Sequence, residues 1–154
     1  MFTTPITQWL DEQEIDYQLL KHSKATVTIA DTARERGIRE QQMVKTILLC
    51  DPAGQLVLAC VPGDRQVSPQ KVRERLQTRR LTCVNSEKLR SLTGFAPGTL
   101  VPMMWCQDIP IVFSCELLEY DQLTISSGSL MAGLLLNKRD LLSLCQPIVH
   151  PICR

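Results

Sequence analysis

The sequence contains no apolar run that approaches membrane length, and its N-terminal residues do not resemble a secretory signal. The formal charge is only +1, so general affinity for polyanions is not expected, and contact with nucleic acid must come from local clusters of basic residues. We therefore expect a cytoplasmic protein with neither a membrane nor DNA as its partner.

The seven cysteines include no CxxC pair and no spacing typical of a zinc site. Most lie in apolar segments, where cysteine behaves as a small hydrophobic residue. We expect reduced thiols, no metal and no cofactor, and a thiol-redox protein is disfavoured because no cysteine pair is available. A serine hydrolase is also disfavoured, because GxSxG is missing and the two histidines are His22 and His150, the latter near an end that we expect to be loose. No P-loop or GxGxxG is present.

The length predicts one domain over residues 1–154. Capping residues and prolines predict helices that begin near Thr4, Thr28, Ser68, Ser86 and Lys138. Apolar segments predict strands at 17–20, 43–50, 56–61, 81–84, 109–115, 122–126 and 131–136. The turn at 51–54 joins the strands 43–50 and 56–61, which are therefore expected to form a hairpin. Short strands in hairpins, interrupted by helices, predict an α+β fold with a mixed sheet surrounded by helices.

The strand at 43–50 is apolar on both alternating faces, as expected for a strand covered on both sides, yet it carries Lys45. This lysine shares a face with Met43, Ile47 and Leu49, where an unpaired ammonium is costly. Two interpretations stay open. Lys45 extends along the strand end to water, or it lies at the bottom of a pocket that binds an anionic or carbonyl-bearing ligand.

Two loops contain residues that suit ligand binding. The first runs from Gly94 to Pro102, where a glycine such as Gly98 allows close approach of the backbone to a ligand, although ordinary turn glycines explain it equally. The second, Ser126-Ser127-Gly128-Ser129, suits a small polar ligand or a phosphate, and also suits a plain turn.

Basic residues cluster between residues 65 and 80, against the single acid Glu74. On a helix, Lys71, Arg75 and Arg79 follow one another at four-residue steps and form one stripe. Such a stripe is either a solvated face or a surface that contacts phosphates.

The ordered set of motifs resembles the YbaK-type aminoacyl-tRNA deacylases, which are related to the editing domain of bacterial prolyl-tRNA synthetases. The resemblance runs from about Ile15 to Leu142, and it depends on 43–48, 61–64, 93–102, 125–128 and 139–141 taken together. It implies a mostly antiparallel, barrel-like sheet and a freestanding hydrolase. The substrate would be the ester of a mischarged aminoacyl-tRNA, with proline tRNA favoured and a synthetase as a further partner.

The resemblance also implies roles for individual residues. Lys45 matches the family's essential lysine, and Gly98 and Pro102 match its GxxxP motif. A ribose hydroxyl of the tRNA is expected to help activate the water. Together with Pro102, the residues expected to bind the substrate are His22, Thr46, Gly94, Ser126, Ser127 and Gly128. Thr46 stands where an asparagine typifies the alanine-clearing branch, and Thr99 and Ser129 depart from the cysteinyl-clearing pattern, so the amino acid that is removed stays open. The alternative is a binding module of the same fold that holds tRNA or a synthetase without hydrolysis.

Overall fold

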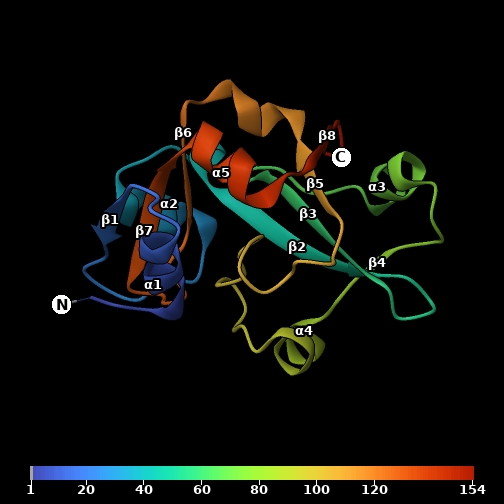
Figure 1. The fold of residues 1–154 in the computed structure, drawn as a ribbon, viewed down its shortest axis with the longest axis horizontal. Helices are drawn as coiled ribbons and strands as arrows, with labels where there is room; N and C mark the ends of the chain where they lie inside the picture. The colour runs from blue at the N-terminus through green and yellow to red at the C-terminus, as the bar shows by residue number, and fades with distance from the viewer. Residues whose placement is uncertain (1) are drawn as a thin grey trace.

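The computed structural model describes residues 2–154 and contains two β-sheets. The three-stranded sheet has the order β1-β7-β6, with β1 at Tyr17–Lys21, β7 at Ala132–Asn137 and β6 at Gln122–Ser126. The five-stranded sheet has the order β4-β2-β3-β5-β8. Its strands are β4 (Thr82–Cys83), β2 (Val44–Cys50), β3 (Leu56–Pro62), β5 (Ile111–Ser114) and β8 (Ile148–His150). The α+β prediction is confirmed (Figure 1).

The larger sheet contains both parallel and antiparallel strand pairs, so it is the mixed sheet that the sequence predicts. The hairpin of β2 and β3 is antiparallel, as predicted, whereas β5 pairs in parallel with both β3 and β8. All pairs in the smaller sheet are antiparallel. A single parallel bridge between Met43 and Thr124 joins the start of β2 to β6, so the two sheets meet at this point.

Five α-helices lie around the sheets within residues 2–154: α1 (Pro5–Glu12), α2 (Ile29–Arg36), α3 (Pro69–Leu76), α4 (Ser86–Thr93) and α5 (Lys138–Cys145). The 3-10 helices η1 (Glu40–Gln42) and η2 (Cys115–Glu119) complete the elements. Thr4, Thr28 and Ser68 cap α1, α2 and α3, because each side chain accepts a hydrogen bond from a backbone N–H of the first turn. The predicted cap at Ser86 is wrong by one residue, since the Asn85 side chain accepts from Lys88 N at 2.8 Å.

Side chains of β2 alternate between separate parts of the core. Val44 and Leu48 pack on one face of the strand, whereas Leu49 packs on the other with Val61 and Val72. Val72 is the inward residue of α3, so this helix covers the second face. Both faces of β2 are therefore covered, as its apolar sequence predicts.

The C-terminal segment is ordered, so the expectation of a loose end near His150 is wrong. Strand β8 pairs with β5, and Ile152 is fully buried among residues that pack against α3. Ser68 N donates to Ile152 O at 2.7 Å, which ties the segment to the cap of α3. These contacts join distant parts of the chain, so the local sequence around His150 does not predict them.

None of the helices between residues 2 and 154 is both long and apolar enough to span a membrane. In the same part of the chain, no three His, Cys, Asp or Glu side chains form a group suited to a metal ion.

All seven cysteines are free thiols, and their environments divide them into accessible and protected groups. Burial raises the pKa of Cys60 to about 12 and that of Cys106 to about 11, so both stay protonated at neutral pH. Burial also raises the pKa of Cys145. Cys83 and Cys115 are exposed.

We predict that only Cys83 and Cys115 react rapidly with a thiol reagent such as DTNB in the native protein at pH 8, because thiolate formation and access are both needed. The double variant Cys83→Ser/Cys115→Ser should lose the fast phase. All seven thiols should react after denaturation in guanidinium. A fast phase that persists in the double variant would contradict the burial described for the other cysteines.

Candidate functional site

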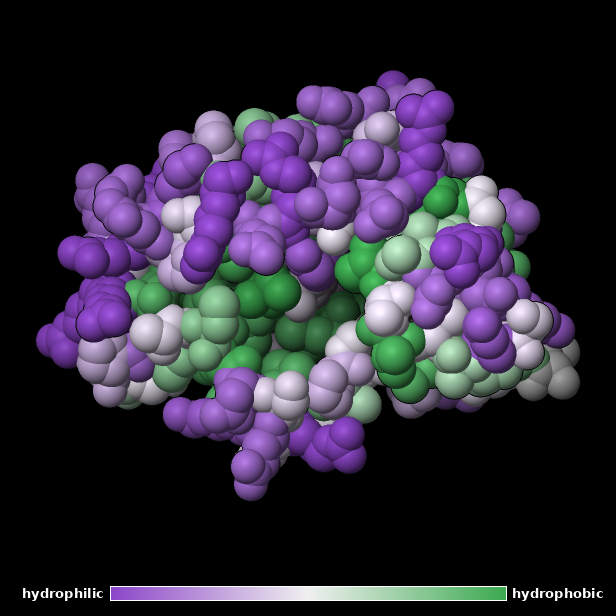
Figure 2. Space-filling model, turned by 180° about the vertical axis from the view of Figure 1, so that it is seen from behind, coloured by the Kyte–Doolittle hydropathy of each residue, from purple (hydrophilic) through white to green (hydrophobic). Residues whose placement is uncertain are grey.

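A cavity of about 290 Å³ lies where the two sheets meet, at the start of β2. Its walls come from residues 26–29 and helix α2, from residues 43–46, from Leu89 of α4, from the loop 97–100, and from Ser126 and Leu130 around the end of β6. Seen from behind, the surface is hollowed beside the arm that carries α4, and much of the hollow is hydrophobic (Figure 2). The cavity is thus formed by segments that are distant in the sequence.

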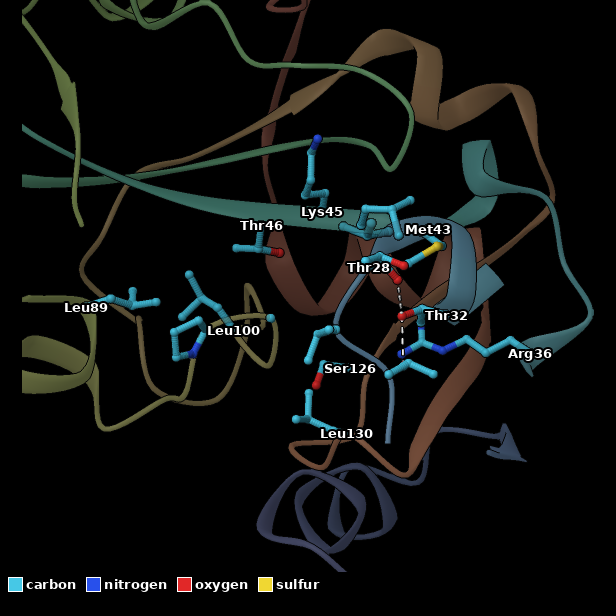
Figure 3. Close-up of a pocket in the computed structure, with 16 residues that line it drawn as sticks. Thr28, Thr32, Arg36, Met43, Lys45, Thr46, Leu89, Leu100, Ser126 and Leu130 are labelled. Carbon is cyan, nitrogen blue, oxygen red and sulfur yellow. Dashed lines mark hydrogen bonds between the residues drawn. The ribbon is translucent and has the colours of Figure 1, made fainter. Parts of the chain in front are cut away.

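Lys45 lies at the edge of this cavity, not at its floor. Thr46 faces the cavity, so strand alternation directs the Lys45 side chain to the other face of β2, and in Figure 3 it extends away from Thr46, Leu100 and Ser126. Its Nζ donates to Gly63 O at 3.4 Å, which leaves two of its three hydrogens without a protein acceptor. Burial lowers the pKa of Lys45, and the nearby Asp64 carboxylate partly opposes this shift. The ammonium therefore has hydrogens available for an anion at this edge of the cavity.

Thr46 and Ser126, two residues with hydroxyl groups that are predicted above to bind the substrate, line the cavity. Thr46 Oγ1 lies 3.6 Å from Cys60 Sγ, and Ser126 Oγ accepts from Gly128 N at 2.9 Å. Because Ser126 Oγ acts as an acceptor in that bond, its hydroxyl hydrogen is available to a ligand.

Gly98 occupies the tip of a turn that faces the cavity. Thr99 N donates to Ala96 O at 3.0 Å, and Gly98 has φ of 84° after Pro97, as in a type II turn. Its N–H donates no hydrogen bond within residues 2–154, and a Cβ at this position would meet no atom within 4 Å. Gly98 is therefore a turn glycine by conformation, and it lines the cavity with a backbone N–H that is unpaired among the described residues.

Several predicted substrate-binding residues do not line this cavity. Ser127 is fully buried, and its hydroxyl donates to Ala132 O at 2.6 Å. Gly128 packs close to Ile6 of α1, and Gly94 ends α4 with φ of 78°. Pro102 lines a separate hollow, with Trp9. These residues lie in the segments around the site and do not line the cavity, so their predicted contact with substrate stays a prediction.

His22 lies behind the cavity wall and contacts a residue that the sequence did not single out. Its Nδ1 lies 2.8 Å from Leu130 O, and since a carbonyl only accepts, this nitrogen carries the hydrogen. Its Nε2 then accepts from Arg36 Nε at 3.2 Å. Arg36 lines the cavity, whereas His22 is not among the lining residues and contacts the cavity wall through Arg36.

The sequence does not predict Arg36 as a site residue, because it is one of several charged residues in a polar helix, where exposure to solvent is the expected outcome. The available signal was Gly133, a lone glycine inside the apolar strand β7, since such a glycine often marks close approach of another group. In the structure, a Cβ at residue 133 would lie only 2.1 Å from Arg36 Nε. Thr26, Thr28 and Thr32 were also missed, and they add hydroxyl groups to the same wall.

The basic stripe is shorter than predicted. Helix α3 ends at Leu76, because Gln77 adopts the left-handed conformation with φ of 53° and Thr78 N donates to Arg73 O. Arg79 therefore lies beyond the helix, and only Lys71 and Arg75 follow each other on it. Lys71 Nζ donates to Cys153 O at 2.7 Å, whereas Arg75 is exposed.

Comparisons with known proteins identify relatives of this chain. Residues 23–144 match the model of the family described as the aminoacyl-tRNA editing domain. The chain is 29% identical over 91 residues to a proline–tRNA ligase of Trichlorobacter lovleyi and 31% identical over 90 residues to one of Moorella thermoacetica. These matches cover 59% and 58% of this chain but only 16% and 15% of the two ligases.

Solved structures share the whole fold. One, described as a hypothetical protein, has a TM-score of 0.87 at 23% identity, over 97% of this chain and 99% of that chain. Another, described as a candidate trans-editing enzyme for prolyl-tRNA synthetase, has a TM-score of 0.83 at 21% identity, over 99% of both chains. At these identities the likeness establishes the fold alone, whereas the family match covers most of the sequence. The chain belongs to the aminoacyl-tRNA editing domain family.

Proposed function

We propose that this protein is a trans-editing aminoacyl-tRNA deacylase, which hydrolyses the ester between a wrong amino acid and the 3′ end of proline tRNA in the cytoplasm. Family membership and the likeness to proline–tRNA ligases support the substrate class. The observation that carries the proposal is the composition of the cavity. It combines hydroxyl groups, a free backbone N–H and a lysine at its edge, and none of its lining residues is Asp, Glu, His or Cys.

Such a cavity suits an ester that is already activated. Water adds to the carbonyl carbon, the bond from that carbon to the ribose oxygen breaks, and the ribose oxygen leaves with a proton. The protein contributes orientation and charge stabilisation, which lower the barrier without a side-chain base. Following the family resemblance, a ribose hydroxyl of the substrate takes the proton from the attacking water and passes its own proton to the leaving ribose oxygen, and the lining, which contains no Asp, Glu or His, is consistent with this.

Each cavity residue then has a distinct role. Lys45 binds the terminal phosphate at the cavity edge, where its ammonium makes one long hydrogen bond of 3.4 Å, to Gly63 O, within the described part of the chain. The Gly98 N–H donates to the ester carbonyl as negative charge develops on the oxygen. Thr46 and Ser126 orient the aminoacyl group with their hydroxyls. Single-turnover hydrolysis of a panel of mischarged proline tRNAs tests the proposal, and binding without hydrolysis would favour a non-catalytic module instead.

We predict that Lys45→Met lowers kcat/KM for mischarged proline tRNA roughly 100-fold, because a cation at the phosphate is lost while the aliphatic stem is kept. Thermal stability should not fall, since removing a partly buried charge relieves its desolvation. Lys21→Met serves as the control, because Lys21 is exposed on β1. Hydrolysis of Lys45→Met at the wild-type rate would eliminate the role given to Lys45.

Gly98→Ala is predicted to lower kcat/KM by about two orders of magnitude, because Cβ enters the space beside the N–H that contacts the carbonyl. Its positive φ also costs about 1 kcal/mol of stability. Gly54→Ala is a matched control, since Gly54 has φ of 89° and equally open surroundings but lies in the β2–β3 turn. If both variants lose equal stability and equal activity, Gly98 is loop architecture only.

The basic residues of α3 and its C-terminal turn generate a prediction about binding. We propose Lys71, Arg75 and Arg79 as tRNA phosphate contacts, and Arg75→Gln should weaken the binding of all tRNAs alike and reduce the salt slope by about one. The triple variant should reduce it further. Filter binding between 50 and 200 mM salt measures these slopes. An unchanged slope in the triple variant would mean that these residues form a solvated surface.

A further inference from the structure

Arg36 places a guanidinium group in the wall of the cavity. It belongs to the last turn of α2, and in Figure 3 its side chain extends from that helix toward Thr32. Nε donates to His22 Nε2 at 3.2 Å, and Nη1 donates to Thr124 Oγ1 at 3.0 Å. Both acceptors belong to uncharged groups, since His22 carries its hydrogen on Nδ1. Arg36 is thus held firmly in place without a counter-ion.

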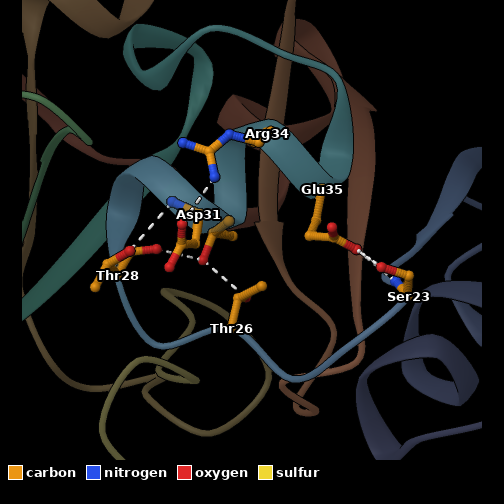
Figure 4. Close-up of polar contacts among 7 residues, drawn as sticks. Ser23, Thr26, Thr28, Asp31, Arg34 and Glu35 are labelled. Atoms are coloured by element: carbon orange, nitrogen blue, oxygen red, sulfur yellow. Dashed lines mark hydrogen bonds and ion pairs between the residues drawn. The ribbon is translucent and has the colours of Figure 1, made fainter.

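The acidic residues of α2 are engaged elsewhere. Asp31 pairs with Arg34 at 3.1 Å, and the Glu35 carboxylate accepts from Ser23 N at 2.5 Å and from Ser23 Oγ at 2.7 Å (Figure 4). No salt bridge within residues 2–154 includes Arg36. Burial lowers the pKa of Arg36 to about 10, so the group remains charged at neutral pH. A desolvated cation without an anionic partner favours a ligand that supplies one.

Part of the guanidinium faces open space. Nη2 has no hydrogen-bond partner among residues 2–154. In that range, every fully buried side-chain nitrogen or oxygen has a partner, so an atom without one must be exposed. Nη2 is therefore accessible. Arg36 is among the residues that line the cavity, so a ligand there can reach the accessible Nη2. Nη1 keeps one hydrogen beyond the one that it donates to Thr124 Oγ1, so Nη1 and Nη2 can together donate to the two oxygens of a carboxylate.

Gly133 creates the room for this arrangement. A Cβ there would lie 2.1 Å from Arg36 Nε and 2.3 Å from Arg36 Cζ. Gly133 pairs with Ser126 in the register of β6 and β7, so the guanidinium lies over the strand pair that also supplies a cavity hydroxyl. Any larger residue at this position displaces the guanidinium.

In Figure 3 Lys45 extends away from Thr46, whereas the Arg36 side chain extends toward Thr32 in the cavity wall. Lys45 is assigned to the terminal phosphate at the cavity edge, which leaves Arg36 for the aminoacyl end. We propose that Arg36 is a specificity-determining residue that binds a carboxylate on the side chain of the aminoacyl group, so that acidic side chains are favoured and cationic ones are rejected. This inference rests on the proposed deacylase function, and it names the class of amino acid that the function removes.

Selectivity between matched esters tests the inference. Proline tRNA charged with glutamate, glutamine or lysine is hydrolysed by the wild type and by Arg36→Met, Arg36→Lys and the exposed control Arg34→Met. We expect the wild type to favour the glutamyl over the glutaminyl ester at least tenfold in kcat/KM, and to act least on the lysyl ester. Arg36→Met should bring the glutamyl-to-glutaminyl ratio to near one, Arg36→Lys should keep part of it, and Arg34→Met should keep all of it.

Gly133→Ala provides a second variant that leaves Arg36 in the sequence but displaces its guanidinium. It should lower the glutamyl preference in the wild-type background and change the ratio less than twofold when added to Arg36→Met. A wild type without acidic preference, or a preference that survives both Arg36→Met and Gly133→Ala, overturns the inference.

A binding measurement separates failure of this inference from failure of the deacylase function. If the wild type hydrolyses none of these esters, NMR titration with free L-glutamate and L-glutamine decides. Shifts of the Arg36 Nε–H and His22 imidazole signals by glutamate, but not by glutamine, and absent in Arg36→Met, uphold the carboxylate subsite. The absence of a shift with glutamate overturns the inference. A shift only with adenosine 3′-monophosphate also overturns it, because Arg36 would then bind a phosphate instead of a carboxylate.

Discussion

The site depends on the covering of strand β2 from both sides. Val44 and Leu48 are buried against one part of the core and Leu49 against another, so the rotation of the strand about its axis is fixed. The bridge between Met43 and Thr124 then joins the start of β2 to the second sheet. Because the strand cannot rotate, Thr46 must face the cavity and its neighbour Lys45 must face the opposite way. A hydroxyl that faces the cavity and a cation at its edge follow from this one constraint.

Local features of the fold could be predicted from the sequence because they depend on neighbouring residues. The caps at Thr4, Thr28 and Ser68 and the β2–β3 hairpin are confirmed. The cap of α4 was placed one residue late, because Asn85 and Ser86 are both good capping residues. Strand β8 was not predicted, since its partner β5 is brought beside it by the tertiary fold.

The candidate site was predictable only where alternation or turn chemistry fixes a side chain. Thr46, Ser126 and Gly98 line the cavity, and Lys45 lies at its edge. Pro102 faces a different hollow, although it is only four positions from Gly98, because the loop turns between them. Arg36 was missed because its burial depends on Gly133 and Thr124, which are distant in the sequence. Charge alone does not distinguish it from the exposed Arg34.

The close approach of Arg36 to Gly133 has a consequence for the evolution of the family. A chain with a side chain at position 133 cannot hold an arginine at position 36 in the same pose, since Cβ and the guanidinium would occupy one space. The two positions are therefore expected to covary, with glycine accompanying arginine and larger residues accompanying its loss.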